Sequence, residues 1–102
     1  MFKVLFTKTI WDGATPEASR TVALFQREET LPFAPTREIA MAWGRSIPEA
    51  PVGIRWEVKD QRFVCTMADG RPHSDGAEDY SFRDLLEEAK VSGWKLVTKG
   101  PV

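Results

Sequence analysis

Residues 54–67 read I-R-W-E-V-K-D-Q-R-F-V-C-T-M and decide the fold. Apolar and polar residues alternate with a period of two on both sides of residues 60–61, which is the pattern of a half-buried β-hairpin. With residues 60–61 as a two-residue loop, Trp56 lies opposite Cys65. One face of the hairpin then carries Ile54, Trp56, Val58, Phe63, Cys65 and Met67. A slip of one residue would destroy this agreement, so the sequence predicts both the hairpin and its buried face.

The other face of this hairpin is charged, with Arg55, Glu57, Lys59 and Arg62 among its residues. Mixed signs are typical of a solvated face, and the face lacks the stacking aromatics of an RNA-recognition sheet. In the predicted register Lys59 lies opposite Arg62. Two like charges in direct opposition disfavour the pairing unless an acid lies nearby.

Three further segments have the composition of strands. Residues 2–11 and 20–26 are rich in β-branched and aromatic types, and the short polar connection between them predicts an antiparallel pair. Residues 94–98 predict a closing strand. Residues 27–35 predict an edge, a bulge or a bend, because Pro32 cannot donate to a β-ladder.

A helix is predicted over residues 81–92. Ser81 is a suitable N-cap, and Asp84 occupies the reciprocal position of a capping box. The apolar stripe consists of Phe82, Leu85, Leu86 and Ala89, and Gly93 provides the C-terminal stop. This stripe and the apolar face of the hairpin are natural packing partners.

Residues 36–45 fit two structures. Thr36 as an N-cap and the content of Ala, Met, Arg and Glu favour a short helix that ends at Gly44. Met41 and Trp43 also alternate with alanines, as they would in a strand. We predict the helix.

These elements predict an α+β fold, in which a mostly antiparallel sheet of about five strands carries the helix 81–92 and the short helix 36–45 on one face. The 102 residues, 42% hydrophobic and 28% charged, are predicted to form a single globular domain spanning 1–102. No apolar run approaches the length of a membrane span. The N-terminal segment lacks the features of a signal peptide, and the single cysteine fits a reducing compartment, so we expect a cytoplasmic protein without a membrane anchor.

Catalytic and metal-binding patterns are scarce. One His and one Cys do not form a zinc set, and no phosphate-binding or nucleophile-elbow motif occurs, so neither a metal nor a cofactor is predicted. Cys65 falls on the buried face of the hairpin, where a thiol is usually inert packing. The best candidate ligand site is the acidic loop 69–80, where an imidazole lies close in sequence to carboxylates. Its candidate ligand residues are His73, Asp75, Glu78 and Tyr80.

Four tryptophans are many for this length, and the patterns leave Trp11 and Trp43 without a core position. These two residues, with Leu31 and Phe33, form the candidate interface. The leading hypothesis is a non-enzymatic binding or accessory protein that acts through protein contacts, in its simplest version a homodimer. The alternative is a small-ligand binder or enzyme with its site at loop 69–80.

A third hypothesis is nucleic-acid binding through Arg37, Arg45 and Trp43. It is the weakest, because a net charge of -1 gives no general attraction to nucleic acid or to anionic membranes.

Overall fold

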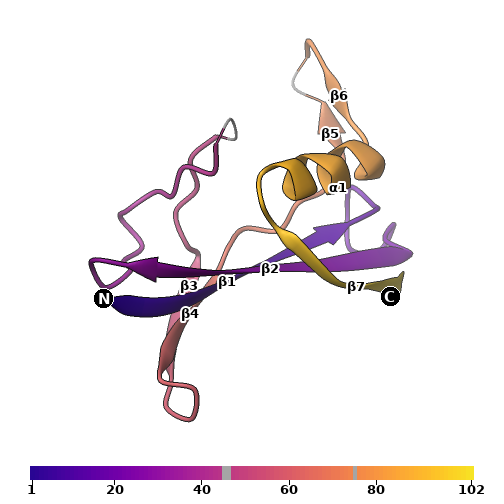
Figure 1. Cartoon of the computed structure of the whole chain (residues 1–102). Helices are drawn as coiled ribbons and strands as arrows, with labels where there is room; N and C mark the ends of the chain where they lie inside the picture. Colours follow the sequence, from indigo (N-terminus) through magenta and orange to yellow (C-terminus); the bar gives the residue numbers. More distant parts are fainter. Residues whose placement is uncertain (45–46, 75) are drawn as a thin grey trace.

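The computed structural model describes residues 1–44, 47–74 and 76–102. A twisted five-stranded sheet forms its centre, in the order β3-β4-β1-β2-β7 (Figure 1). The elements are β1 (Phe2–Trp11), β2 (Thr21–Leu31), β3 (Gly53–Glu57), β4 (Arg62–Thr66), β5 (His73–Ser74), β6 (Asp79–Tyr80), α1 (Phe82–Val91) and β7 (Lys95–Pro101). The short strands β5 and β6 pair with each other outside the main sheet.

The sheet is mixed, so the prediction of a mostly antiparallel sheet is only partly correct. β1 and β2 form the predicted antiparallel pair, and β2 also pairs antiparallel with β7. β4, however, runs parallel to β1, with Val4 beside Phe63. A parallel pair needs a long crossover, which residues 12–61 provide, and no local sequence pattern reports such a pairing.

Helix α1 forms as predicted. Ser81 is its N-cap: the Ser81 hydroxyl accepts a hydrogen bond from the Asp84 amide, and the Asp84 carboxylate accepts one from the Ser81 amide. This capping box satisfies two amides that the first helical turn leaves without partners. After the helix, Gly93 has a φ of 95°, a backbone conformation that favours glycine. In the described chain α1 packs mainly against β1 and β7, whereas the sequence suggested the β3–β4 hairpin as its main partner.

The predicted helix over residues 36–45 is absent from its described part, residues 36–44. A single turn occurs near Thr36, and Met41 then forms an isolated bridge with Glu49 through two backbone hydrogen bonds. Trp43 points inward from this segment. Burial of two large side chains on the sheet outweighs the small helix propensity of the segment.

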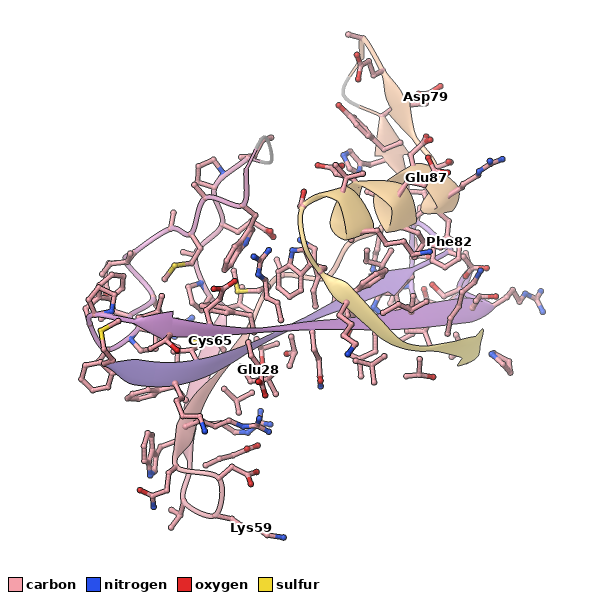
Figure 2. All side chains as sticks on the ribbon, in the orientation of Figure 1. Glu28, Lys59, Cys65, Asp79, Phe82 and Glu87 are labelled. Carbon is pink, nitrogen blue, oxygen red and sulfur yellow. The ribbon has the colours of Figure 1, made fainter. Side chains whose placement is uncertain are left out.

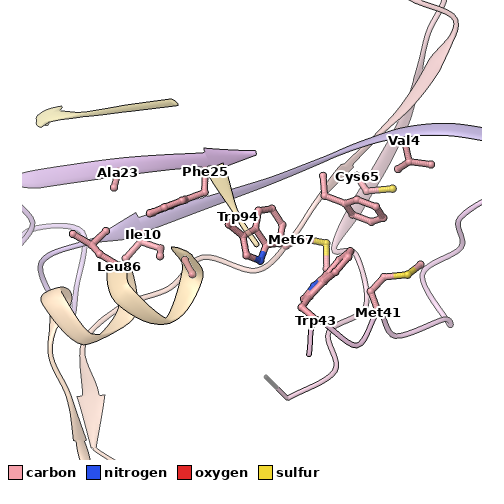
Figure 3. Packing of buried hydrophobic residues seen from close by; sticks show 12 residues of the cluster. Val4, Ile10, Ala23, Phe25, Met41, Trp43, Cys65, Met67, Leu86 and Trp94 are labelled. Carbon is pink, nitrogen blue, oxygen red and sulfur yellow. The ribbon is translucent and has the colours of Figure 1, made fainter. Parts of the chain in front are cut away.

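The core lies between the sheet and two covering parts, α1 and the long segment that follows β2 (Figure 3). Beneath α1, the helix residue Leu86 lies close to Ile10 and Phe25. In the segment that follows β2, Met41 and Trp43 lie near Cys65 and Met67 on the sheet side. The core is therefore continuous along the sheet, although one covering part comes from the middle of the chain and the other from near its C-terminus.

The β3–β4 hairpin forms with the predicted faces but with a shifted register. Trp56 lies opposite Phe63 and Glu57 opposite Arg62, and a four-residue turn over residues 58–61 replaces the predicted two-residue loop. Because the register shifts by two residues, each strand side chain stays on its predicted face of the hairpin. It also replaces a like-charge opposition at Arg62 with an ion pair to Glu57 at 2.9 Å, which explains the preference.

The far half of this hairpin is not covered, which corrects the prediction that Trp56 and Val58 are core residues. Trp56 is 47% exposed and Val58 is 71% exposed. The hairpin projects away from α1, with Lys59 at its tip, and Asp79 of the β5–β6 hairpin lies on the opposite side of the molecule (Figure 2). An apolar surface therefore remains open at one edge of the sheet.

Candidate functional site

A cleft of about 400 Å³ lies between β1, α1 and the β5–β6 hairpin. This volume falls in the range of small-molecule sites. The cleft is lined by Lys8, Ile10, Ile47, Glu49, Gly70, His73, Tyr80, Leu85, Glu88, Ala89, Ser92 and Trp94. These residues come from five separate parts of the chain, so the cleft exists only in the folded protein.

The loop that leaves β4 is fixed to β1 before it reaches the cleft. The Gly70 amide donates to the Thr9 carbonyl, and the Trp11 amide donates to the Gly70 carbonyl, both at 2.9 Å. A Cβ at position 70 would lie 3.2 Å from Ile10 Cγ1, so glycine permits this close approach. This attachment lies directly before the β5–β6 hairpin, which borders the cleft together with α1.

One wall of the cleft consists of two stacked rings. The His73 and Tyr80 rings lie opposite each other in the β5–β6 pairing, with centroids 4.8 Å apart and an interplanar angle of 24°. His73 Nδ1 donates to the Arg71 carbonyl at 2.8 Å, which leaves Nε2 as the acceptor in the neutral ring. The Tyr80 hydroxyl donates to Glu78 Oε2 at 3.1 Å. Both rings are therefore oriented by hydrogen bonds.

An ion pair forms another part of the lining. Lys8 Nζ lies 2.6 Å from Glu49 Oε1, and the two side chains are only 18% and 24% exposed. Lys8 Nζ also lies 5.9 Å from the centroid of the Trp94 ring. The positive charge of Lys8 is thus satisfied within the protein.

The helix side of the cleft is apolar and carries one acid, Glu88. Leu85 and Ala89 project from α1 toward the buried Trp94 and provide the apolar part of the lining. Glu88 forms no ion pair within residues 1–44, 47–74 and 76–102. With Lys8 matched by Glu49, the charge left over in the lining is that of Glu88.

The structure brings together part of the predicted ligand loop. His73 and Tyr80 line the cleft, and Glu78 contacts it indirectly through the Tyr80 hydroxyl. Asp75 lies outside the described residues. Within the described chain, no group of three or more His, Cys, Asp or Glu side chains is arranged to hold a metal ion.

None of the four candidate interface residues is among those that line the cleft, and they differ in exposure. Trp43 is 8% exposed, with the guanidinium of Arg27 4.1 Å from its ring centroid. It therefore has no free ring face for a partner or a nucleic-acid base, and Arg45 lies outside the described residues. Trp11 is half-buried and donates to Asp69 Oδ2 at 3.1 Å.

Leu31 is half-buried against the core, and Phe33 is exposed. Leu31 pairs with Phe2, whose ring packs against that of Phe63 at 6.0 Å, and Phe63 packs against Trp56 at 5.0 Å. These contacts form a row of apolar side chains across β2, β1, β4 and β3. Of the predicted interface, Leu31 thus belongs to an exposed apolar surface, whose most exposed large ring is that of Trp56.

Sequence reasoning missed Lys8, Glu49, Glu88 and Trp94 as lining residues. Glu88 follows Leu85 by three positions, so these two residues share one face of the predicted helix, and this was the one available signal. Lys8 and Glu49 are 41 positions apart in the chain, and nothing local indicates their pairing.

Comparisons with family models, with curated proteins and with solved structures each found no match to this chain. In the described parts of the chain, no helix has the length and apolar character needed to span a membrane.

Proposed function

We propose that this protein binds a small organic cation with an apolar body in the cleft between α1, β1 and the β5–β6 hairpin. The observation that carries this proposal is a cleft of about 400 Å³ that combines aromatic rings with a carboxylate, Glu88, that forms no ion pair in the described part of the chain. Aromatic faces and a nearby acid attract ammonium groups. An anion would instead have to displace Glu49 from Lys8.

Each part of the cleft has a separate role in this proposal. Glu88 attracts the cationic group, and the ring of Tyr80 is one of the aromatic rings that line the cleft. Leu85, Ala89 and Trp94 contact the apolar body of the ligand. The acceptor Nε2 of His73 is available for an N–H of the ligand.

The side chains of the protein favour binding over catalysis. The Cys65 thiol is fully buried in the core, and this burial raises its pKa, so it remains protonated at neutral pH and is a poor nucleophile. The single histidine is committed through Nδ1 to a backbone carbonyl, which orients the ring but does not activate a nucleophile.

An NMR titration with 2-phenylethylammonium tests the proposal, with phenylacetate as an anion of similar size and shape. A fragment of this size is expected to bind with a Kd of about 1 mM or weaker. Glu88→Gln should weaken binding of the cation by about fivefold, because it removes one partly screened charge contact.

Glu87→Gln is the matched control. Glu87 is the adjacent helix residue, does not line the cleft and pairs with Arg83 at 3.3 Å, so its substitution should leave the Kd unchanged. Equal binding of phenylacetate, or equal losses in the Glu87 and Glu88 variants, would contradict the proposal.

A further inference from the structure

The edge of the sheet at β3 has backbone groups available for pairing. Met67 donates to the Thr7 carbonyl of β1 at 2.9 Å, so alternate residues of β4 turn their backbone groups toward β1, and the residues between them turn toward β3. Through the observed register, Arg55 is bonded to β4. The N–H and C=O groups of Ile54 and Trp56 therefore point away from the sheet, where the described chain has no further strand.

We propose that this edge pairs with β3 of a second copy of the chain, antiparallel and centred on Trp56. The sequence I-R-W-E-V over residues 54–58 is self-complementary in this arrangement. Arg55 lies opposite Glu57 of the second copy, and Ile54 lies opposite Val58, the turn residue that follows β3. Trp56 lies opposite its own equivalent, on the same face as the apolar pair.

The backbone geometry agrees with this register. Trp56 is one of the two strand residues whose N–H and C=O groups point outward, so two copies exchange a reciprocal pair of hydrogen bonds at the centre. The arrangement has a two-fold axis through that pair, as a closed dimer requires. In a register displaced by one residue, Arg55 would lie at the centre. Its N–H and C=O groups already bond to β4, so the two central hydrogen bonds between the copies would be lost.

The side chains on both faces support the same partner. On the apolar face, Trp56 is 47% exposed, and the rings of Phe63 and Phe2 extend the surface behind it. On the charged face, Arg55 is 3.6 Å from Glu57 of its own strand, whereas Arg62 holds the same carboxylate at 2.9 Å. Arg55 is thus the weaker partner within the chain and can bond the Glu57 of a second copy.

The other edge of the sheet provides a contrast. β7 carries Lys95 and Lys99, and Pro101 lies at its end. Lysines and proline are the residues that protect an edge strand from pairing. The β3 edge, in contrast, carries charges that are complementary to those of a second β3 strand. This favours a second copy of the chain as its partner.

Sedimentation velocity from about 1 to about 300 µM tests the proposal, since a short edge contact of this type is expected to be weak. The wild-type chain should show a reversible monomer–dimer equilibrium. Arg55→Glu and Glu57→Arg should each raise the dimer Kd by about tenfold or more, because each places like charges opposite each other twice per dimer. An equimolar mixture of the two variants should restore dimerisation, since both opposed pairs are then complementary.

Lys95→Glu, a charge reversal on the opposite edge, is the matched control and should leave the dimer Kd unchanged. Glu57→Arg also removes the ion pair to Arg62, so the fold of each variant is checked by circular dichroism. If that variant does not fold, Trp56→Ser replaces it and should weaken the dimer by about tenfold. A wild-type chain that stays monomeric throughout, a dimer insensitive to Arg55→Glu or Trp56→Ser, or a mixture of folded variants that fails to associate would overturn the proposal.

Discussion

Replacing Arg27 by Met should destabilise the protein strongly, because this charged side chain joins the two parts that cover the core. Arg27 is on β2, beneath the junction of these two parts, and its side chain is only 16% exposed. One terminal nitrogen donates to the Ser92 carbonyl at 2.6 Å, and the other nitrogens donate to Glu29 Oε1 at 2.8 and 3.1 Å. Its guanidinium lies over the Trp43 ring.

The magnitude follows from these contacts. A hydrogen bond from a charged donor to a carbonyl contributes about 2 kcal/mol to stability. The contact with the Trp43 ring contributes about 1 kcal/mol. The pair with Glu29 is more exposed, and we assign it about 0.5 kcal/mol after allowance for solvent screening. Met fills much of the volume of the arginine stem, so we expect a loss of about 3 kcal/mol and a fall in Tm of roughly 15 °C.

Urea unfolding followed by tryptophan fluorescence measures the change in the free energy of unfolding. Arg27→Lys retains the charge but not the planar fork, and should lose about half as much stability. Arg83→Met is the control, because Arg83 is an exposed helix residue with one ion pair, and it should change stability by less than about 0.5 kcal/mol. A loss below about 1 kcal/mol for Arg27→Met would refute the view that this side chain joins the two covering parts.

Two further predictions concern local features. Ser81→Ala removes one half of the capping box with Asp84 and should cost about 1 kcal/mol, measured by urea unfolding; an unchanged midpoint would show that the cap contributes nothing. The backbone amides of Thr21 and Arg20 donate to Asp12 and hold the pKa of its carboxyl below the ordinary value of 3.8. Because the folded pKa is the lower one, the stability from Asp12 is complete above the unfolded value and disappears as the pH falls through the folded value. Asp12→Asn should therefore flatten the decline of Tm below about pH 4, and a decline of wild-type size in the variant would contradict this.

The features that the sequence predicted correctly depend on neighbours in the chain. The capping box of Ser81 and Asp84 lies within a single turn, and the β1–β2 pair is joined by a short connection. The faces of the β3–β4 hairpin follow from alternation alone. Its register was wrong, although the like charges at Lys59 and Arg62 indicated the problem, because the ion pair to Glu57 decides it.

The features that the sequence did not predict depend on long-range packing. The parallel pairing of β1 with β4 places the hairpin away from α1, and this exposes Trp56. The same topology brings the segment after β2 onto the sheet, where Trp43 is buried beside Arg27. Local patterns therefore predicted Trp56 as a core residue and Trp43 as an interface residue, whereas in the structure Trp56 is exposed and Trp43 is buried.

The residues of the cleft also divide into those predicted from local sequence and those that depend on long-range packing. The composition of loop 69–80 identified His73 and Tyr80, because function concentrates in turn-rich loops held by rigid elements. Glu88 and Trp94 join them only when α1 packs against β1. When a site is assembled from distant parts of the chain, the sequence predicts only those of its residues that lie close together in the chain.

The position of ligand binding tests the proposed function most directly, and a two-dimensional ¹H–¹⁵N NMR spectrum can report it through the four tryptophan indole N–H signals. On addition of 2-phenylethylammonium, the Trp94 indole signal in the cleft should shift in proportion to occupancy. The Trp56 signal on the distant hairpin should not shift. A Trp94 signal that stays fixed at saturating probe, or a shift confined to Trp56, would contradict the proposal that the cleft is the binding site.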